Sequence, residues 1–259
     1  MSASIILWQK QMKKSLVHSE EIIGMLIQPI LWVVLFGVGM KSLMGSVSSG
    51  DGDGYMTFIL PGIVALTAVG GAIGGGSTWL NERLMGIVKE YLVAPIPRLS
   101  ILMGNALSIT TKVLIQSVVI MIVGVLMGAK LSVNPLGWLG GFLLITGYGI
   151  GFSGVALAVA SKTDSADGYH MMIFMLQLPL LFWSNSLYPL ATLPTWMRVG
   201  AIVNPTTYVV TGLRAITMAP AADVAAVDSI ALWLCFTVIA AFAAIGMGLA
   251  LKAFKSAIK

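Results

Sequence analysis

The 259-residue sequence is 58% hydrophobic and only 10% charged, whereas a soluble domain carries about 25% charged residues. So few charges cannot cover the surface of a soluble fold of this length, so the composition excludes that class and predicts an all-α integral membrane protein. The net charge of +5 comes from short basic clusters between apolar stretches. This pattern fits loops at an anionic membrane surface and argues against a nucleic-acid partner. The single cysteine, Cys235, cannot form an intrachain disulfide.

Residues 1–21 predict an amphipathic helix that lies on the inner membrane surface. Apolar side chains, Trp8 among them, share the segment with Lys10, Lys13 and Lys14 at roughly helical spacing. A disordered basic tail is the alternative. The segment has no small-residue cleavage site after a short apolar core, so we expect the first apolar stretch to stay as an anchor.

Six apolar stretches are long enough to cross a bilayer, which takes about 20 residues of helix. We expect one transmembrane domain over residues 1–259, with six spans at about 22–43, 55–80, 107–129, 136–160, 169–187 and 230–251. Its parts are 1–21 (interfacial helix), 22–80 (first two spans), 81–100 (cytoplasmic segment), 101–187 (third to fifth spans), 188–228 (external segment) and 229–259 (sixth span and tail). Pro179 is expected to kink the fifth span, and neighbouring helices can accommodate such a kink.

The distribution of Lys and Arg predicts the orientation. With both termini in the cytoplasm, eleven basic residues lie on or near the inner side and four lie outside. The inner set is Lys10, Lys13, Lys14, Arg83, Lys89, Arg98, Lys112, Lys162, Lys252, Lys255 and Lys259, and the outer set is Lys41, Lys130, Arg198 and Arg214. We therefore expect a multi-pass protein of the plasma membrane with cytoplasmic termini and an external loop at 45–54.

The cytoplasmic segment 81–100 predicts a short charged helix that contacts a soluble partner. Glu82 and Gly86 stand four residues apart, as do Gly86 and Glu90, so in one helix they share a face with Arg83 and Lys89 close by. Pro95 and Pro97 would then end the helix. An ordinary solvated loop of balanced charge is the alternative.

The external segment after the fifth span is mostly apolar but divided at Asn204–Pro205. Its halves, 195–203 and 206–218, are too short to span a bilayer, and Arg198 and Arg214 should keep them out of lipid. We expect short re-entrant helices in the outer leaflet, with Trp196 and Tyr208 in the interfacial aromatic belt.

Residues 70–78 (GGAIGGGST) have the glycine spacing of a phosphate-binding loop, but Ser77 stands where that loop requires lysine. Because the run lies in a predicted span, helix packing through the pairs Gly70/Gly74 and Gly71/Gly75 is the better interpretation. The sequence offers no other nucleotide-binding motif. Any ATP and Mg²⁺ that drive this protein would be bound by another chain, and we expect no cofactor in this one.

Residues 151–154 (GFSG) resemble the nucleophile motif of intramembrane rhomboid proteases. Ser153 would need a histidine at matching depth, but His170 is expected at the inner edge of its span, whereas Ser153 is expected about 10 Å from the inner end of its own span. A small polar residue at a tight helix contact is the better interpretation of Ser153. His18 and His170 lack acidic or cysteine neighbours at ligand spacing, so the sequence predicts neither a metal site nor a catalytic residue.

The predicted spans hold almost no ionisable groups, whereas ion-coupled carriers keep such groups at mid-membrane. Lys112 lies near the inner end of its span, where it can reach the interface. Spans lined by apolar residues and a few hydroxyls favour an amphipathic or lipid-like substrate and a motor outside the membrane. An ion-coupled carrier or a channel is the alternative, ahead of an intramembrane serine protease.

Three stretches resemble the membrane subunit of type-2 ABC exporters (the ABC-2 permease family), particularly the branch that exports drugs, lipooligosaccharides and polyketides. The first is 56–66 (MTFILPGIVAL), similar to the entry of the family's second span. The second is 81–105 (NERLMGIVKEYLVAPIPRLSILMGN), similar to its coupling-helix region. The third is 187–216 (LYPLATLPTWMRVGAIVNPTTYVVTGLRAI), similar to its external re-entrant segment.

The resemblance implies six spans per subunit and a dimer, formed with a second copy or a homologous permease, above two ABC ATPase subunits. It implies that a connecting helix (Trp8, Lys10, Lys13, Lys14) and a coupling helix (Glu82, Arg83, Gly86, Lys89, Glu90) contact the ATPases. It also implies a re-entrant gate with Pro194, Asn204, Pro205, Tyr208 and Arg214. The expected function is ATP-driven export of a drug, lipid or glycolipid. Asn105 departs from the family pattern, which often has a basic residue there, and Lys112 follows one to two turns later.

Overall fold

The computed structural model describes residues 3–17, 23–24, 26–36, 39, 53–93, 97–132, 134–190, 193–217 and 230–257. Several predictions fall outside these residues. They concern His18, Lys41, Pro95, Lys259, most of the predicted loop 45–54, and 218–229 of the external segment.

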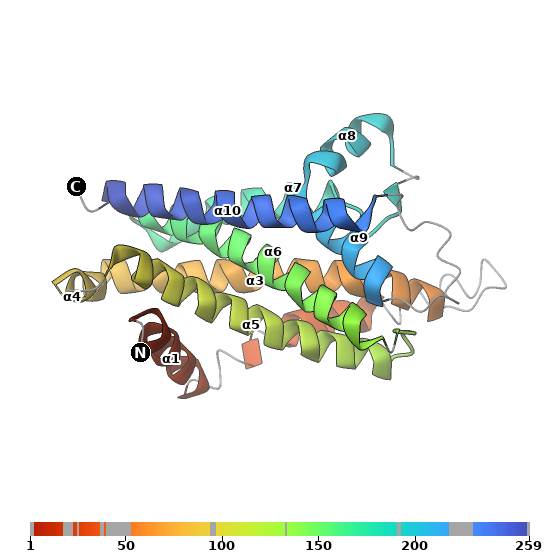
Figure 1. The fold of residues 1–259 in the computed structure, drawn as a ribbon, viewed down its shortest axis with the longest axis horizontal. Helices are drawn as coiled ribbons and strands as arrows, with labels where there is room; N and C mark the ends of the chain where they lie inside the picture. The colour runs from red at the N-terminus through yellow and green to blue at the C-terminus, as the bar shows by residue number, and fades with distance from the viewer. Residues whose placement is uncertain are drawn as a thin grey trace.

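Four long helices lie side by side along the long axis of the molecule (Figure 1). They are α3 (Asp53–Leu84), α5 (Arg98–Leu126), α6 (Pro135–Lys162) and α10 (Leu232–Ala257). Among the described residues, these four are the helices long and apolar enough to cross a membrane. The spans predicted at 55–80, 107–129, 136–160 and 230–251 are thereby confirmed as helices.

The predictions for the first and fifth spans are met only in part. Within 22–43 the structure describes an apolar helix at Leu26–Phe36. The fifth span was predicted to reach residue 187, but α7 (Ala166–Phe182) has 17 residues and ends at its C-cap, Trp183. At 1.5 Å per residue it is about 25 Å long, and Pro179 lies in its last turn rather than deep inside a span.

Helix α6 is the centre of the bundle because it packs against α3, α5, α7, α9 and α10. Its backbone meets that of α10 at Gly154, where an added Cβ would lie 2.3 Å from the carbonyl carbon of Gly246. Ser153, beside this contact, is fully buried and donates its hydroxyl proton to the Ile150 carbonyl in its own helix at 2.8 Å. The predicted role of Ser153 at a tight helix contact agrees with this geometry.

The glycine run 70–78 lies inside α3, and some of its glycines pack closely against other helices. Added Cβ atoms at Gly71 and Gly75 would lie 2.9 Å from Val113 and 2.2 Å from Ile109 of α5, whereas those at Gly70 and Gly74 would meet nothing within 4 Å. Of the two predicted packing pairs, Gly71/Gly75 therefore brings two helices together within this chain.

Four short helices lie at the ends of the bundle. Helices α1 (Ala3–Val17) and α4 (Ile87–Val93) lie at the end where α10 finishes, and α8 (Thr195–Val203) stands off the opposite half (Figure 1). Helix α9 (Pro205–Thr217) is buried against α3, α6 and α10. The two helices predicted on either side of Asn204–Pro205 thus form α8 and α9, although α9 is enclosed by protein.

Candidate functional site

At one end of the bundle, α1, α3 and α5 meet around a buried carboxylate, that of Glu82, which is 3% exposed. Gln11 Nε2 donates to Glu82 Oε1 at 3.0 Å and to Asn105 Oδ1 at 3.3 Å, and Lys14 Nζ lies 3.4 Å from the same Glu82 oxygen. Asn105 Nδ2 donates to the Ile101 carbonyl at 3.0 Å. We call Gln11, Lys14, Glu82 and Asn105 the Glu82 cluster, because each is bonded to that carboxylate or to its partner.

The face of α1 that carries Leu7, Gln11 and Ser15 is buried against the bundle. Trp8 Nε1 donates to Thr111 Oγ1 of α5 at 3.0 Å. Gly104 allows this contact, since an added Cβ there would lie 2.7 Å from Leu7 Cβ. Trp8 therefore binds α1 to α5, whereas Lys10, Lys13 and Lys14 are exposed.

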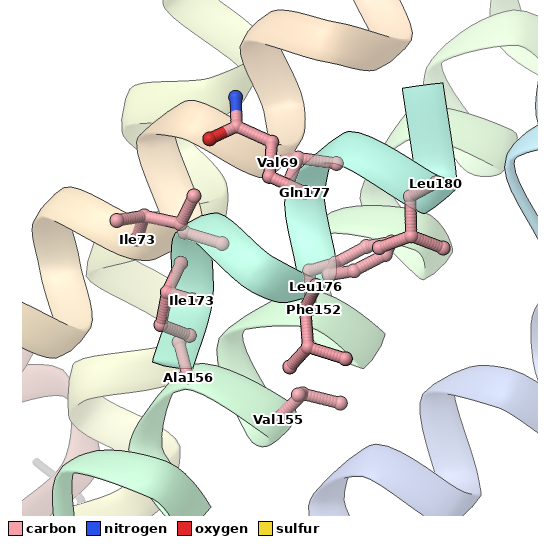
Figure 2. A pocket seen from close by; sticks show the side chains of 10 residues that line it. Val69, Ile73, Phe152, Val155, Ala156, Ile173, Leu176, Gln177 and Leu180 are labelled. Carbon is pink, nitrogen blue, oxygen red and sulfur yellow. The ribbon is translucent and has the colours of Figure 1, made fainter. Parts of the chain in front are cut away.

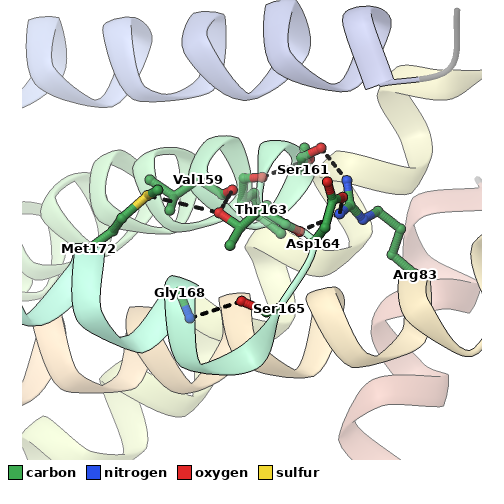
Figure 3. A network of polar contacts seen from close by, with 9 residues as sticks. Arg83, Val159, Ser161, Thr163, Asp164, Ser165, Gly168 and Met172 are labelled. Carbon is green, nitrogen blue, oxygen red and sulfur yellow. Dashed lines mark hydrogen bonds and ion pairs between the residues drawn. The ribbon is translucent and has the colours of Figure 1, made fainter.

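Arg83 follows Glu82 but points to a different element (Figure 3). Its guanidinium donates to the backbone carbonyls of Ser161 and Thr163, and to Asp164 Oδ1 at 2.8 Å. Carbonyls at the end of a helix lack intrahelical donors, so Arg83 caps the C-terminal end of α6. The last turn of α3 is thereby linked to α6 and to the connection into α7.

The chain leaves the helix at Gly86, whose φ of 81° is in the left-handed region, and α4 begins at Ile87. The prediction that Glu82, Gly86 and Glu90 share one helix face is therefore wrong, because a glycine turn separates α3 from α4. Lys89 and Glu90 lie in α4, and Glu90 is exposed.

Lys10 of α1 contacts Tyr91 of α4: its Nζ donates to the Tyr91 hydroxyl at 2.6 Å and lies 4.8 Å from the ring centroid. The hydrogen bond that Lys10 donates to Tyr91 raises the pKa of Lys10 above its ordinary value, against a smaller opposing effect of burial.

On the other side of the molecule, Arg214 of α9 is buried, with 1% of its surface exposed. Its Nε donates to the Phe58 carbonyl at 3.1 Å, and its Nη2 donates to the carbonyls of Asn185 at 2.7 Å and Ser186 at 3.4 Å. The guanidinium also lies 3.6 Å from the centroid of the Phe58 ring. The charge was expected to keep its helix out of lipid, and backbone carbonyls solvate it inside the protein.

Asn204, between α8 and α9, bonds in two directions. Its Nδ2 donates to the carbonyls of Leu180 at 2.9 Å and Trp183 at 2.8 Å, at the end of α7. Its Oδ1 accepts from the Thr206 backbone N–H at 2.9 Å and so caps α9, in which Pro205 is the first residue.

The other predicted residues of this segment differ in their surroundings. Pro194 is the exposed N-cap of α8. Trp196 is 66% exposed, and its ring lies 6.5 Å from that of Trp183. Tyr208 is buried and donates its hydroxyl proton to the Ile202 carbonyl at 2.8 Å. The expected place of Tyr208 in an interfacial belt is therefore wrong, whereas the exposure of Trp196 permits it.

Sequence reasoning missed the segment Ser184, Asn185 and Ser186, each fully buried without being helical. Asn185 Nδ2 donates to Thr211 Oγ1 of α9 at 2.7 Å. Three consecutive polar residues inside an apolar stretch were the available signal that the fifth helix ends early.

The remaining candidates form no reaction centre. His170 Nε2 lies 3.4 Å from Ser77 Oγ and so faces α3, away from the bond that Ser153 makes. No group of three or more His, Cys, Asp or Glu residues could hold a metal ion in the described parts of the chain.

A pocket between α3, α6 and α7 holds about 10 Å³, room for about one water molecule (Figure 2). It is lined by Val69, Ala72, Ile73, Phe152, Val155, Ala156, Ile173, Leu176, Gln177 and Leu180. A substrate does not fit there.

Comparison with known proteins adds the family. Residues 3–218 match the family model described as ABC-2 type transporter. The ycf38 protein of Cyanophora paradoxa, whose name describes a transport permease, is 32% identical over 197 residues, which cover 74% of this chain and 66% of that protein. The match thus spans slightly less than two thirds of that relative.

Two bacterial proteins are similar at lower identity. The daunorubicin resistance ABC transporter permease protein DrrB1 of Streptomyces coeruleorubidus is 24% identical over 197 residues, which cover 75% of this chain and 67% of that protein. The inner membrane transport permease YadH of Escherichia coli K12 is 23% identical over 191 residues, 73% of each chain. The family model matches most of this chain, and the described residues include four helices long and apolar enough to cross a membrane. This chain therefore belongs to the ABC-2 type transporter family.

Proposed function

We propose that this chain is the permease subunit of an ATP-binding cassette exporter. Two copies, or one copy and a homologous permease, form a pathway for an amphipathic or lipid-like substrate, and a separate subunit binds ATP and Mg²⁺. The match to the ABC-2 type transporter family over residues 3–218 is the observation that carries the proposal. Because the name of DrrB1 refers to daunorubicin resistance, an amphipathic drug is the substrate class we propose first.

The bonds of Glu82 and Arg83 support a particular route for coupling. Both residues lie in the last turn of α3, but Glu82 is bonded to α1 and α5, whereas Arg83 is bonded to the end of α6. A push on α4 by an ATPase would therefore move α3 and reach three other helices through these two side chains. Glu90 on α4 is exposed and provides a surface for that contact, with Lys89 as its sequence neighbour. Glu82 and Arg83 transmit the movement rather than touch the ATPase.

The exposed side chains of α1 support a place at the membrane surface. Lys10 and Lys13 are exposed together with Ile6 and Leu16, a mixture that suits anionic headgroups and acyl chains. In this proposal the protein lies in the plasma membrane, and this end of the bundle and both chain termini face the cytoplasm. Lipid is the expected partner there, and no surface suggests nucleic acid.

The test is to purify the chain in mild detergent and identify the proteins that accompany it. The expected result is an ATPase subunit with a nucleotide-binding motif in equal amount. Inside-out vesicles that contain both proteins should then accumulate daunorubicin when ATP is added. Accumulation that follows an ion gradient without ATP would contradict the proposal and favour an ion-coupled carrier.

A matched pair of variants tests the coupling route. Glu90→Lys on α4 should lower drug-dependent ATP hydrolysis, whereas Lys255→Glu, an opposite charge reversal at an exposed site of α10, should leave it near the wild-type rate. Equal ATP hydrolysis in both variants would show that α4 is not the contact.

A further inference from the structure

The turn between α7 and α8 is a buried break in the helical structure. Residues Ser184, Asn185 and Ser186 are fully buried, yet none of them is helical. Non-helical backbone at membrane depth is tolerated only where protein or a water-filled cavity provides hydrogen-bond partners. The donors that bond its carbonyls therefore decide whether the turn can stay in place.

The donors in the described contacts come from α9 and its cap. Asn204 donates to Leu180 and Trp183, the carbonyls that α7 leaves open at its end. Arg214, almost three turns further along, donates to Asn185 and Ser186. Two side chains thus bond four carbonyls on both sides of the break.

The same arginine extends the contact to α3, because its Nε donates to the Phe58 carbonyl. One turn later in α3, Gly62 lies directly against the break. A Cβ added there would lie 2.3 Å from the Ser186 oxygen, so any side chain would force the turn away. The end of α7, the start of α3 and all of α9 are therefore joined at this point.

We infer that Asn204 and Arg214 form a latch that holds the outer end of the permeation pathway closed at rest. The inference rests on the proposed exporter function, which places this end of the bundle outside. Both are positioning residues: they fix the turn against α3 and need not touch the substrate. Movement of the turn away from α9 removes the donors from four carbonyls together, so the latch opens only when ATP-driven movement of the helices supplies the energy.

The chain contains a matched control for Asn204. Asn134 also precedes a proline and also caps a helix, since its Oδ1 accepts from the Leu136 N–H at 3.1 Å. Its amide nitrogen has no hydrogen-bond partner among the described residues, whereas that of Asn204 has two. Asn→Asp at either position keeps the capping oxygen and removes the amide donors. The latch should therefore respond to the change at Asn204 and not to that at Asn134.

The experiment measures access to the turn in the intact permease–ATPase complex. Cys235 is first replaced by alanine, and Ser186→Cys then introduces one reporter thiol into the turn. The complex in lipid vesicles is treated with a membrane-impermeant maleimide from the outer side, with and without ATP. Labelling should be slow without ATP and faster with it.

Adding Asn204→Asp should raise the labelling rate without ATP about tenfold and lower the amount of drug exported per ATP hydrolysed. Asn134→Asp should change neither. A labelling rate in Asn204→Asp equal to that in Asn134→Asp, in a complex that transports, would overturn the latch. If Asn204 had a purely structural role, Asn204→Asp would instead lower thermal stability, without the combination of faster labelling in the absence of ATP and less drug exported per ATP.

Arg214→Lys provides an independent second variant if Asn204→Asp does not assemble. Lysine keeps the charge, but a single ammonium cannot reach Phe58 on one side and Asn185 and Ser186 on the other. Faster labelling without ATP is again expected, and unchanged labelling would contradict the latch. Failure of the unmodified complex to transport would count against the proposed function, whatever the labelling shows.

Discussion

At the end of the bundle that carries α1, the buried carboxylate of Glu82 is bonded to side chains, whereas on the far side the buried guanidinium of Arg214 is bonded to backbone carbonyls. Lys14, one partner of Glu82, has 45% of its side chain exposed, so the first site is open to water. Arg214 and its partners are enclosed. Side chains can exchange partners when helices shift, whereas the backbone carbonyls around Arg214 lose their donor only when a whole segment moves.

One oxygen of the Glu82 carboxylate, Oε2, is buried without a hydrogen-bond partner among the described residues. A carboxylate with one oxygen unbonded gains less from its burial than one that is fully solvated by donors. Together with its side-chain partners, this suits a site at the α1 end that can rearrange when helices shift.

Replacement of Arg214 by methionine should cause the largest loss of stability. Three carbonyls lose their charged donor in an enclosed site, which should lower the free energy of unfolding by about 3–5 kcal/mol. The measurement is thermal unfolding in detergent. Arg198→Met on the exposed face of α8 is the control and should cost less than about 0.5 kcal/mol. Similar losses in the two variants would remove the contrast between the two ends of the bundle.

Glu82→Ala should have a smaller effect, about 2 kcal/mol, because Gln11 loses its buried acceptor while Lys14 can turn to water. Asp164→Ala removes a carboxylate that is 95% exposed although it also accepts from an arginine, and should cost no more than about 0.5 kcal/mol. Unfolding curves of both variants, recorded beside that of Arg214→Met, give the order. A greater loss for Glu82→Ala than for Arg214→Met would reverse the assignment of the rigid end.

The long helices could be predicted from the sequence because lipid demands about 20 apolar residues in a row, and α3, α5, α6 and α10 meet that demand. The end of α7 could not be predicted in this way. The polar run Ser184, Asn185 and Ser186 signals an end but does not show what bonds the open backbone groups. The Asn204 side chain, which bonds Leu180 and Trp183, and the Arg214 side chain, which bonds Asn185 and Ser186, lie about 20 and 30 residues away in the sequence. The local amino-acid composition does not predict hydrogen bonds to such distant residues.

The candidate site was found in outline but with the wrong surroundings. Glu82 was expected in a charged cytoplasmic helix and Arg214 in an external segment kept out of lipid, whereas both side chains are buried in protein. Besides water, the polar groups of the protein itself can solvate a charge that avoids lipid. Gln11, which bonds Glu82, was missed because a single glutamine in a short helix with lysines has no distinctive spacing.

The turn at Gly86 tests how firmly α4 is fixed to the α1 end. Gly86→Ala places a Cβ on a residue with φ of 81°, which should cost about 1 kcal/mol although no atom lies nearby. Gly86→Asn should cost less, since asparagine tolerates this conformation. Gly74→Ala is the control: it lies inside a helix with open space, and should stabilise the protein by about 0.5–1 kcal/mol. Equal effects of alanine at 86 and 74 would indicate that the turn is free to rearrange.

The contact between Lys10 and Tyr91 should give the smallest effect, because it lies at the surface of the α1 end. Tyr91→Phe removes the hydroxyl that accepts from Lys10 and should cost about 0.5 kcal/mol or less. That hydroxyl raises the pKa of Lys10 above its ordinary 10.5, so the folded state holds this proton more tightly than the unfolded state. The contribution of this contact to stability is therefore complete below pH 10.5 and is lost as the pH rises through the higher pKa of the folded state.

Thermal unfolding at pH 8 should show the small difference in stability between wild type and Tyr91→Phe, and this difference should be smaller above pH 10.5. Tyr188→Phe, whose hydroxyl lies on the other side of the molecule, should change stability at neither pH. No difference at pH 8 would mean that Tyr91 stabilises the α1 end through its ring alone, and a difference that grew with pH would contradict the role of the Lys10 proton.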